Sequence, residues 1–292
     1  MAKLNAPSAT RSSKPFALSS RAKLGLILVV AYTLFASTQL GFSWDRFEAG
    51  LGHGAKFLAR MFPPNFDRGA MLWKGIAESL EIAVLATTLG IILALPLSLL
   101  GARNLMPAWA SWPARAFISL CRALHPVIVA IIFVKAVGFG ALAGVLALTV
   151  ASIGFIGKLF TESIEEISLK QVEAVRATGA SFPNVIIFSV MPQVFARFVG
   201  FSTYQLDSNL RNSTMVGIVG AGGIGGTLFS AFQRFDYDFV CTILLSIIAI
   251  IMVGEVLAGI VRSILLDNVS PTELFRGKAH RPRQARPIED DA

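Results

Sequence analysis

Long uncharged stretches of apolar residues constrain this chain more than any other feature of its sequence. Leu24–Phe42, Ile82–Ala102 and Ala136–Gly157 contain no acidic or basic side chain over 19, 21 and 22 residues. A helix of roughly 20 apolar residues crosses the hydrocarbon core of a bilayer. Only 15% of all residues are charged, well below the roughly 25% of an average soluble domain. The sequence therefore predicts an integral membrane protein and excludes a soluble enzyme or a disordered chain.

Three further stretches complete the predicted set of spans. Phe239–Val261 carries one charge, Glu255, whereas Ala116–Val137 and Val194–Arg211 contain several polar and charged residues. The glycines of 138–140 are expected to form a tight turn between the third and fourth spans. We therefore expect an all-α integral membrane protein with six transmembrane helices. The first is interpreted as an uncleaved span, because its apolar run exceeds the about 7–15 residues typical of a signal peptide.

The distribution of basic residues predicts how the chain is oriented. Cytoplasmic segments of membrane proteins carry an excess of Lys and Arg. With both termini in the cytoplasm, 16 of the 26 Lys and Arg residues fall on cytoplasmic segments and 6 on outer segments. The net charge of +8 then reflects membrane topology and does not indicate nucleic acid as a partner. We expect a multi-pass membrane protein with both termini in the cytoplasm, surrounded by the lipid bilayer.

The same pattern divides the chain into five segments. A helix over 44–62, with Phe47 and Leu51 among charged residues, is predicted to lie on the outer membrane interface and to end at the Pro63-Pro64 pair. The segments are a cytoplasmic basic tail (1–23), an N-terminal transmembrane helix (24–42), a periplasmic segment with the interfacial helix (43–75), a core of five transmembrane helices (76–266) and a cytoplasmic tail (267–292).

The residues that commonly carry catalysis or bind metals are scattered. Cys121 and Cys241 lie inside apolar stretches, and the three histidines are far apart in the sequence. This spacing fits neither a metal site nor a nucleophile with its base, so we expect no catalytic residue and no metal. The sequence also has no G-x-x-x-x-G-K-[ST] motif for binding ATP. We expect no cofactor on this chain.

The run Gly220-Ala-Gly222-Gly223-Ile-Gly225 matches the G-x-G-x-x-G pattern of a dinucleotide site through Gly220, Gly222 and Gly225, with Gly223 as a further glycine inside it. Such a site requires a soluble βαβ unit, whereas a predicted membrane span over 239–261 follows these glycines. We interpret them as a tight re-entrant bend near the outer surface, where one backbone segment approaches another.

The segment of about 162–192 has the features of a docking element. One short helix is expected to end near Gly179, and a second to begin at a Ser181 cap with Pro183 in its first turn. Its pattern is Glu173-Ala174-Val175, three residues, Gly179, nine residues, then Ser189-x-Met191-Pro192.

This pattern resembles the EAA loop of ABC importer permeases, which reads Glu-Ala-Ala, three residues, Gly, nine residues, Ile, one residue, Leu-Pro. Glu173, Ala174, Gly179 and Pro192 match it, and Val175, Ser189 and Met191 depart from it. The resemblance implies a type I ABC importer permease fold, in which this loop is a cytoplasmic coupling helix that inserts into the ATPase subunit. The implied contacts are Glu173, Ala174, Val175, Arg176, Gly179 and Ala180. The implied location is the bacterial inner membrane. The implied partners are a second copy of the chain in a homodimer, two ATP-binding subunits that would hold ATP and Mg²⁺, and an extracytoplasmic solute-binding protein.

Further motifs are similar to the phosphonate-type permeases. They are the runs over 100–104, 135–140, 144–148, 176–180 and 207–225, so that the similarity extends over roughly residues 60–265. This resemblance implies that the cargo is a phosphonate or a related phosphorus oxyanion. It leaves open whether this cargo is a phosphonate, phosphite, phosphate or another anion.

The polar stretch before the glycine bend is the candidate substrate path. A charge at the centre of a membrane helix costs about 2.5–3.5 kcal/mol, so such residues usually face a cavity or a partner. Asp207 and Arg211 are spaced for an ion pair on one helical face, and the guanidinium suits an oxyanion. We assign five residues to the translocation path: Asp207, Asn209, Arg211, Ser213 and Thr214. The alternative is a structural pair that holds two helices together.

Two other transporter classes remain as alternatives. A methionine-type or other small-solute ABC permease would keep the coupling loop but lack the pattern of 207–214. An ATP-independent secondary transporter would more often show inverted halves with broken helices, and no such symmetry is visible in the sequence.

Overall fold

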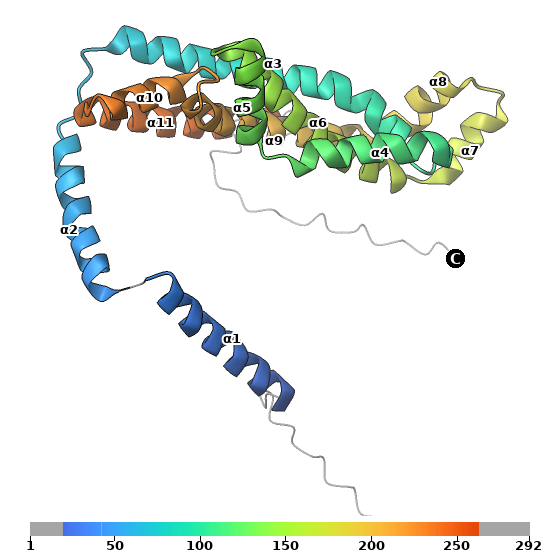
Figure 1. Ribbon diagram of the computed structural model, residues 1–292. Coiled ribbons are helices and arrows are strands. Elements are labelled where there is room, and N and C mark those ends of the chain that lie inside the picture. Colours follow the sequence, from blue (N-terminus) through green and yellow to red (C-terminus); the bar gives the residue numbers. More distant parts are fainter. Residues whose placement is uncertain (1–19, 42, 263–292) are drawn as a thin grey trace, which may run out of the picture. The chain divides into compact units, whose positions relative to one another are not determined.

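The computed structural model describes residues 20–41 and 43–262, and every regular element among them is a helix (Figure 1). The chain divides into two compact units, 1–60 and 61–292, each of which is considered by itself. The predicted tail over 267–292 and most of the predicted tail over 1–23 lie outside the described residues.

The first unit contains two helices of different character. Helix α1, Ser20–Gln39, is apolar and has no buried residue within its unit. This exposure is what a helix surrounded by lipid would show. Helix α2, Trp44–Met61, is amphipathic. Its apolar side chains Trp44, Phe47, Leu51 and Leu58 recur at helical spacing and are exposed. The predicted helix over 44–62 is thus confirmed, and its position on the membrane interface stays a prediction.

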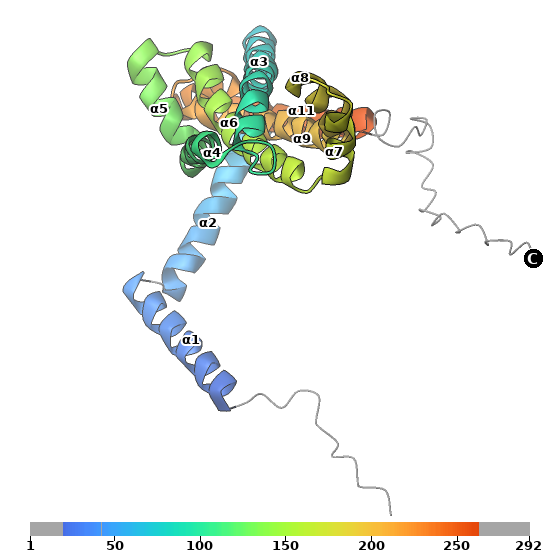
Figure 2. The same cartoon turned by 90° about the vertical axis from the view of Figure 1, so that its right-hand side faces the viewer.

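The second unit is built around long apolar helices. They are α3 (Gly69–Gly101), α6 (Ala141–Glu165), the helical run Phe182–Ile218 that contains α9 (Met191–Ile218), and α11 (Tyr237–Arg262). Together with α1, five described helices are long and apolar enough to cross a membrane. The number becomes six if the bent pair of α4 (Ala108–Ala123) and α5 (Pro126–Val137) is one broken span. Figure 2 shows this pair on one side of α3 and α6, opposite the short helices α7 and α8.

The predicted span over 116–137 is broken into two helices. The chain bends by 92° between α4 and α5. Pro126 has no backbone N–H and disfavours a helical conformation in the preceding residue. Accordingly His125 is extended, and its Nδ1 accepts a hydrogen bond of 3.3 Å from the N–H of Val127 at the start of α5.

Two other helices are longer than expected. Helix α3 begins at Gly69 instead of Ile82, and α9 continues to Ile218 instead of ending near Arg211. Charged residues mark where a span meets a polar environment, but backbone hydrogen bonding continues through them. In contrast, the turn predicted over 138–140 is confirmed, because Gly138 and Gly140 have φ values of +91° and +130°.

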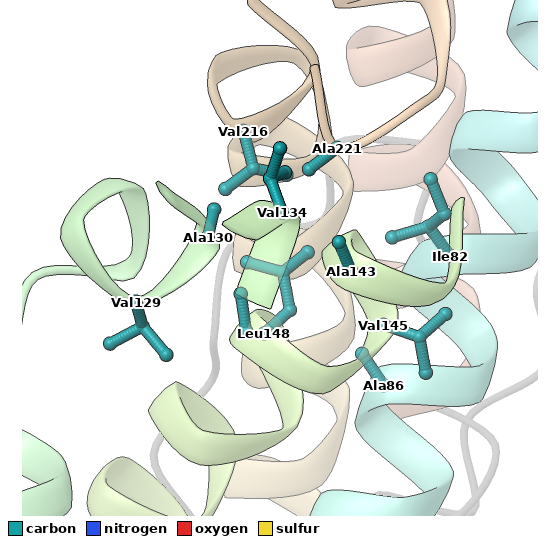
Figure 3. Packing of buried hydrophobic residues seen from close by; sticks show 11 residues of the cluster. Ile82, Ala86, Val129, Ala130, Val134, Ala143, Val145, Leu148, Val216 and Ala221 are labelled. Carbon is teal, nitrogen blue, oxygen red and sulfur yellow. The ribbon is translucent and has the colours of Figure 1, made fainter. Parts of the chain in front are cut away.

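Small residues allow the helices of the second unit to approach closely. A Cβ atom placed on Gly90 of α3 would lie 2.3 Å from the Cβ of Ser152 on α6. Figure 3 shows the neighbouring core, in which alanine and branched aliphatic side chains of α3, α5, α6, α9 and the bend after α9 pack together; it includes Ile82, Ala86, Ala130, Val134, Ala143, Leu148, Val216 and Ala221. Membrane helices associate by such close packing because lipid provides no hydrophobic driving force between them.

We expect Gly90→Ala to destabilise the second unit by about 1–3 kcal/mol, because the added methyl group overpacks the contact between α3 and α6. The matched control is Gly259→Ala on α11, where an added Cβ meets nothing within 4 Å. The midpoint of thermal unfolding of the detergent-solubilised protein measures both changes. Equal midpoints for the two variants would contradict the packing described.

Candidate functional site

The segment between α6 and α9 folds as two short helices separated by a glycine. Helix α7 covers Leu169–Ala177 and α8 covers Phe182–Val185. Gly179 between them has a φ of +78°, a conformation that glycine adopts without strain. Ser181 occupies the N-cap position of α8, but its side chain makes no capping hydrogen bond. A π-helical turn, Ile186–Val190, then leads into α9.

One side of this segment is fixed by apolar packing. Val172 of α7 and Val185 of α8 are 2% and 1% exposed. They belong to a buried cluster with Phe160 and Ile164 of α6 and Val194 of α9. The segment is therefore held in place on the ends of the two long helices, at one end of the second unit (Figure 1).

The other side of the segment is open. Of the predicted contact residues, Glu173, Ala174, Arg176 and Gly179 are exposed. Val175 and Ala180 are half-buried and pack against the apolar cluster. The six residues are thus divided between an outer edge that a partner can touch and an inner edge that anchors it.

Polar contacts connect this segment with α9. The Arg197 guanidinium pairs with Glu166 at 2.5 Å. The N–H of Ser168 donates to Oε1 of Gln193 at 2.9 Å, and Nε2 of Gln193 donates to the carbonyl of Ser189 at 2.8 Å.

The end of α6 is also connected with α3 and α4. Glu165 accepts a hydrogen bond of 2.9 Å from the N–H of Arg103 and forms an ion pair with Arg115. Nδ2 of Asn104 donates to the carbonyl of Ile164 at 2.7 Å. The end of α6 is therefore linked by short polar contacts to α4, to α9 and to the residues that follow α3.

Helix α9 has a buried polar face that the sequence analysis did not foresee. Asn209 is fully buried, and its Nδ2 donates to Oγ1 of Thr87 on α3 at 2.9 Å and to Oγ of Ser152 on α6 at 2.8 Å. Nε2 of Gln205 donates to Ser152 and to Oδ1 of Asn209, both at 3.0 Å. These four side chains hydrogen-bond α9 to α3 and α6. We call them the buried amide network.

The opposite face of α9 presents a stripe of less buried side chains. Tyr204, Ser208, Arg211 and Met215 recur at helical spacing, with Tyr204, Arg211 and Met215 exposed and Ser208 half-buried. We call these four residues the α9 stripe. The predicted pair of Arg211 with Asp207 is present, and Thr214 is half-buried beside it.

Asp207 lies at the edge of a cavity between α3, α9 and α11. This cavity has a volume of about 460 Å³ and is lined mainly by apolar side chains. The Asp207 side chain is 10% exposed. Its Oδ2 pairs with Arg211, whereas its buried Oδ1 has no hydrogen-bond partner in the described part of the chain.

The residues assigned to the translocation path therefore do not share one surface in this conformation. Asn209 and Ser213 are fully buried and face other helices, whereas Arg211 lies on the α9 stripe. The part of these residues in transport stays a prediction.

The glycine bend follows α9 at the end of the second unit opposite α7 and α8 (Figure 1). Gly220, Gly222 and Gly223 have φ values of +91°, +82° and +77°. A Cβ on Gly225 would lie 1.9 Å from the carbonyl oxygen of Thr214, so that the chain turns back onto α9. The short helix α10, Ile224–Gln233, then leads toward α11.

Two ion pairs lie at this same end of the unit, between residues that precede α3 and residues that follow α10. Asp236 follows α10 and pairs with Arg68, which precedes α3, at 2.7 Å. A second contact of 3.2 Å joins Asp236 to Arg234. The hydrogen bond from Arg68, followed by the one from Arg234, holds the pKa of the Asp236 carboxyl below its ordinary value.

Comparison with known proteins decides the family. Residues 86–271 match the model of the family described as "Binding-protein-dependent transport system inner membrane component". The chain belongs to this family. Its members are multi-pass inner membrane permeases of ABC importers, which work with ATP-binding subunits and a binding protein. Membership excludes the ATP-independent transporter considered above.

Three permeases of named transport systems are similar to this chain over most of its length. The phosphate-import permease protein PhnE of Mycolicibacterium smegmatis is 40% identical over 241 residues, which is 82% of this chain and 44% of that protein. The chain thus spans less than half of the length of this relative. The phosphite transport system permease protein PtxC of Stutzerimonas stutzeri is 37% identical over 215 residues, covering 73% of this chain and 78% of that protein. The putative phosphite permease HtxC of the same species is 34% identical, covering 77% and 80%.

Solved structures confirm the predicted permease fold. An inward-facing MetNI methionine ABC transporter gives a TM-score of 0.58 at 23% identity and covers 67% of this chain and 98% of the matched chain. An amino acid ABC transporter solved with histidines gives 0.56 at 19% identity, covering 69% and 95%.

The buried amide network is expected to hold α3, α6 and α9 together. We predict that Asn209→Ala lowers the stability of the permease by about 1–2 kcal/mol, because it removes hydrogen bonds that no water replaces. Asn212→Ala is the control, since the single side-chain bond of Asn212, to Ser208, is 3.3 Å long. Thermal unfolding in detergent compares the two, and an equal loss in both variants would contradict a special role of the network.

Proposed function

We propose that this permease carries a phosphonate or a related phosphorus oxyanion across the bacterial inner membrane. The observation that carries the proposal is the exposed guanidinium of Arg211 in the interior of a long apolar helix. A guanidinium presents a planar fork of donors that matches an oxyanion. The proposal is also supported by the relatives named for phosphate and phosphite transport, at 34–40% identity. The methionine alternative has weaker support, because the probable D-methionine permease MetI of Vibrio cholerae is 25% identical over 115 residues.

The working unit in this proposal is a homodimer in which two copies of the α9 stripe face each other. A charged side chain exposed on a membrane helix is costly next to lipid, so it usually faces a cavity or another chain. Two stripes with one Arg211 each would enclose a wet passage of positive potential between the copies. Asp207 would lower the cost of burying Arg211 and leave part of its fork for the substrate.

The exposed edge of α7 is the proposed contact with the ATPase subunits. Glu173, Ala174, Val175, Arg176, Gly179 and Ala180 form or support this edge, and each copy of the permease would engage one of two ATPase subunits. ATP and Mg²⁺ bind to those subunits in this proposal, and the permease itself holds no cofactor. This arrangement puts α7, α8 and both termini in the cytoplasm, as the excess of basic residues on these segments favours.

The contacts of α6 suggest how ATP-driven movement reaches the passage. Closure of the ATPase subunits would displace α7, which is packed on the ends of α6 and α9. The ion pairs of Glu165 and Glu166 with Arg115 and Arg197 would pass this movement to α4 and α9. The buried amide network would make α3, α6 and α9 move together, so that the passage opens alternately to each side. An extracytoplasmic binding protein would deliver the cargo at the end that carries the glycine bend.

Coupling is tested by Glu173→Lys and Gly179→Val in vesicles that contain the permease and its ATPase subunits. We expect transport per ATP hydrolysed to fall roughly tenfold. Glu173→Lys reverses a charge at the contact, and Gly179→Val places a β-branched residue at a positive φ, where it is strained. Gly52→Val on α2 is the control, since its added Cβ meets nothing within 4 Å. Unchanged transport in both α7 variants would contradict the assignment of this contact.

The substrate assignment is tested in the same vesicles with binding proteins loaded with phosphonate, phosphite, phosphate or methionine. We expect a phosphorus oxyanion to stimulate hydrolysis and uptake, and stimulation by methionine alone would overturn the proposal. Arg211→Ala should reduce uptake by roughly 10–100-fold, and Arg211→Lys by less, because it retains charge without the fork. Met215→Ala on the same stripe is the control. An equal loss of transport and of assembly with the ATPase would instead favour a structural role of the pair.

A further inference from the structure

A polar pocket outside the proposed passage lies where α3, α4 and α6 meet. It has a volume of about 210 Å³ and is lined by Arg103, Arg115, Ile118, Ser119, Lys158 and Thr161. Arg103 follows the end of α3, Arg115 and Ser119 lie on α4, and Lys158 and Thr161 lie near the end of α6. The pocket is therefore at the end of the permease that carries α7 and α8.

Positive charge predominates in this pocket. Lys158 pairs with Glu162 at 2.8 Å, and Arg115 pairs with Glu165 and donates to the carbonyl of Gly101 at 2.8 Å. The guanidinium of Arg103 forms no ion pair within the described residues, and the contact of Arg103 with Glu165 is made by its backbone N–H. Three cations thus face two carboxylates, and one guanidinium has its donors available to a ligand.

Exposed aromatic residues place the pocket near a membrane interface. Trp109 and Trp112 on the first turns of α4 are 80% and 73% exposed. Tryptophan is enriched at the level of lipid headgroups, where its ring is apolar and its N–H reaches polar groups. Arg115 follows Trp112 on α4 by less than one helical turn, a rise of about 4.5 Å along the helix axis.

We propose that this pocket binds a phosphate oxyanion, with the headgroup of an anionic phospholipid as its source. Basic pockets between membrane helices on the cytoplasmic side bind such headgroups, and the tryptophan pair favours a lipid over a soluble ion. The fork of Arg103 and the ammonium of Lys158 would hold the phosphate oxygens. The bound lipid would then reinforce the junction of α3, α4 and α6, which Glu165 joins beside the coupling segment.

The test measures binding and does not depend on transport or on the identity of the cargo. The purified full chain in detergent is titrated with dioctanoyl phosphatidylglycerol, dioctanoyl phosphatidylcholine or inorganic phosphate, and its midpoint of thermal unfolding is followed. We expect a saturable rise with phosphatidylglycerol. The half-saturating concentration should increase roughly tenfold or more in the double variant Arg103→Gln, Lys158→Gln, because each basic residue contributes to binding an anionic lipid.

Two further variants make the result decisive. Arg122→Gln removes one positive charge from the exposed surface of α4, outside the pocket lining. Its half-saturating concentration of phosphatidylglycerol should equal that of the unaltered chain. If the double variant does not fold, Arg103→Gln alone is used, since the backbone contact of Arg103 with Glu165 is retained. A second outcome is that inorganic phosphate raises the unfolding midpoint as much as phosphatidylglycerol does, with the rise weakened in the Arg103 and Lys158 variants. That result would support the oxyanion site and identify a soluble ion as the ligand. An equal response to phosphatidylcholine, or no difference between the double variant and Arg122→Gln, would overturn the proposal.

Discussion

The structure of the permease core depends on hydrogen bonds that are satisfied where no water is available. The bilayer interior offers no partner for an amide or a hydroxyl group, so such a group must find one inside the protein. Asn209 and Gln205 meet this requirement by bonding to Thr87 and Ser152. The network fixes the rotation of α9 against α3 and α6, and this rotation determines which residues of α9 lie on its opposite face.

This fixed rotation gives the two faces of α9 different tasks. The buried face joins helices, and the α9 stripe is left with Tyr204, Ser208, Arg211 and Met215. Close packing at Gly90 supports the same arrangement, because α3 and α6 must approach within reach of the short side chain of Ser152. The charged C-terminal end of α6 extends the assembly toward α7. There Glu165 pairs with Arg115 of α4, and Glu166 pairs with Arg197 of α9.

Local sequence patterns predicted the parts of the permease that depend on local physics. The apolar runs predicted the spans. Gly179, Ser181 and Pro183 predicted the two short helices α7 and α8, because a positive φ and a proline ring restrict the backbone at the residue that carries them. The bend at Pro126 was missed although its signal was present, since many membrane helices tolerate proline within one span. The partners Thr87 and Ser152 were missed because a single polar residue in an apolar run looks the same whether it is bonded or not.

The sequence by itself determined that this chain is a helical membrane protein with a coupling loop of the ABC importer type. Those conclusions rest on hydropathy and on motif spacing, which need no knowledge of distant contacts. Only the tertiary structure decided that Asn209 and Ser213 face other helices while Arg211 lies on the exposed face of the same helix. It also brought Arg103, Arg115 and Lys158 into one pocket. Both results depend on how helices separated by tens of residues rotate and pack against one another, and that is set by side-chain packing and buried hydrogen bonds between them.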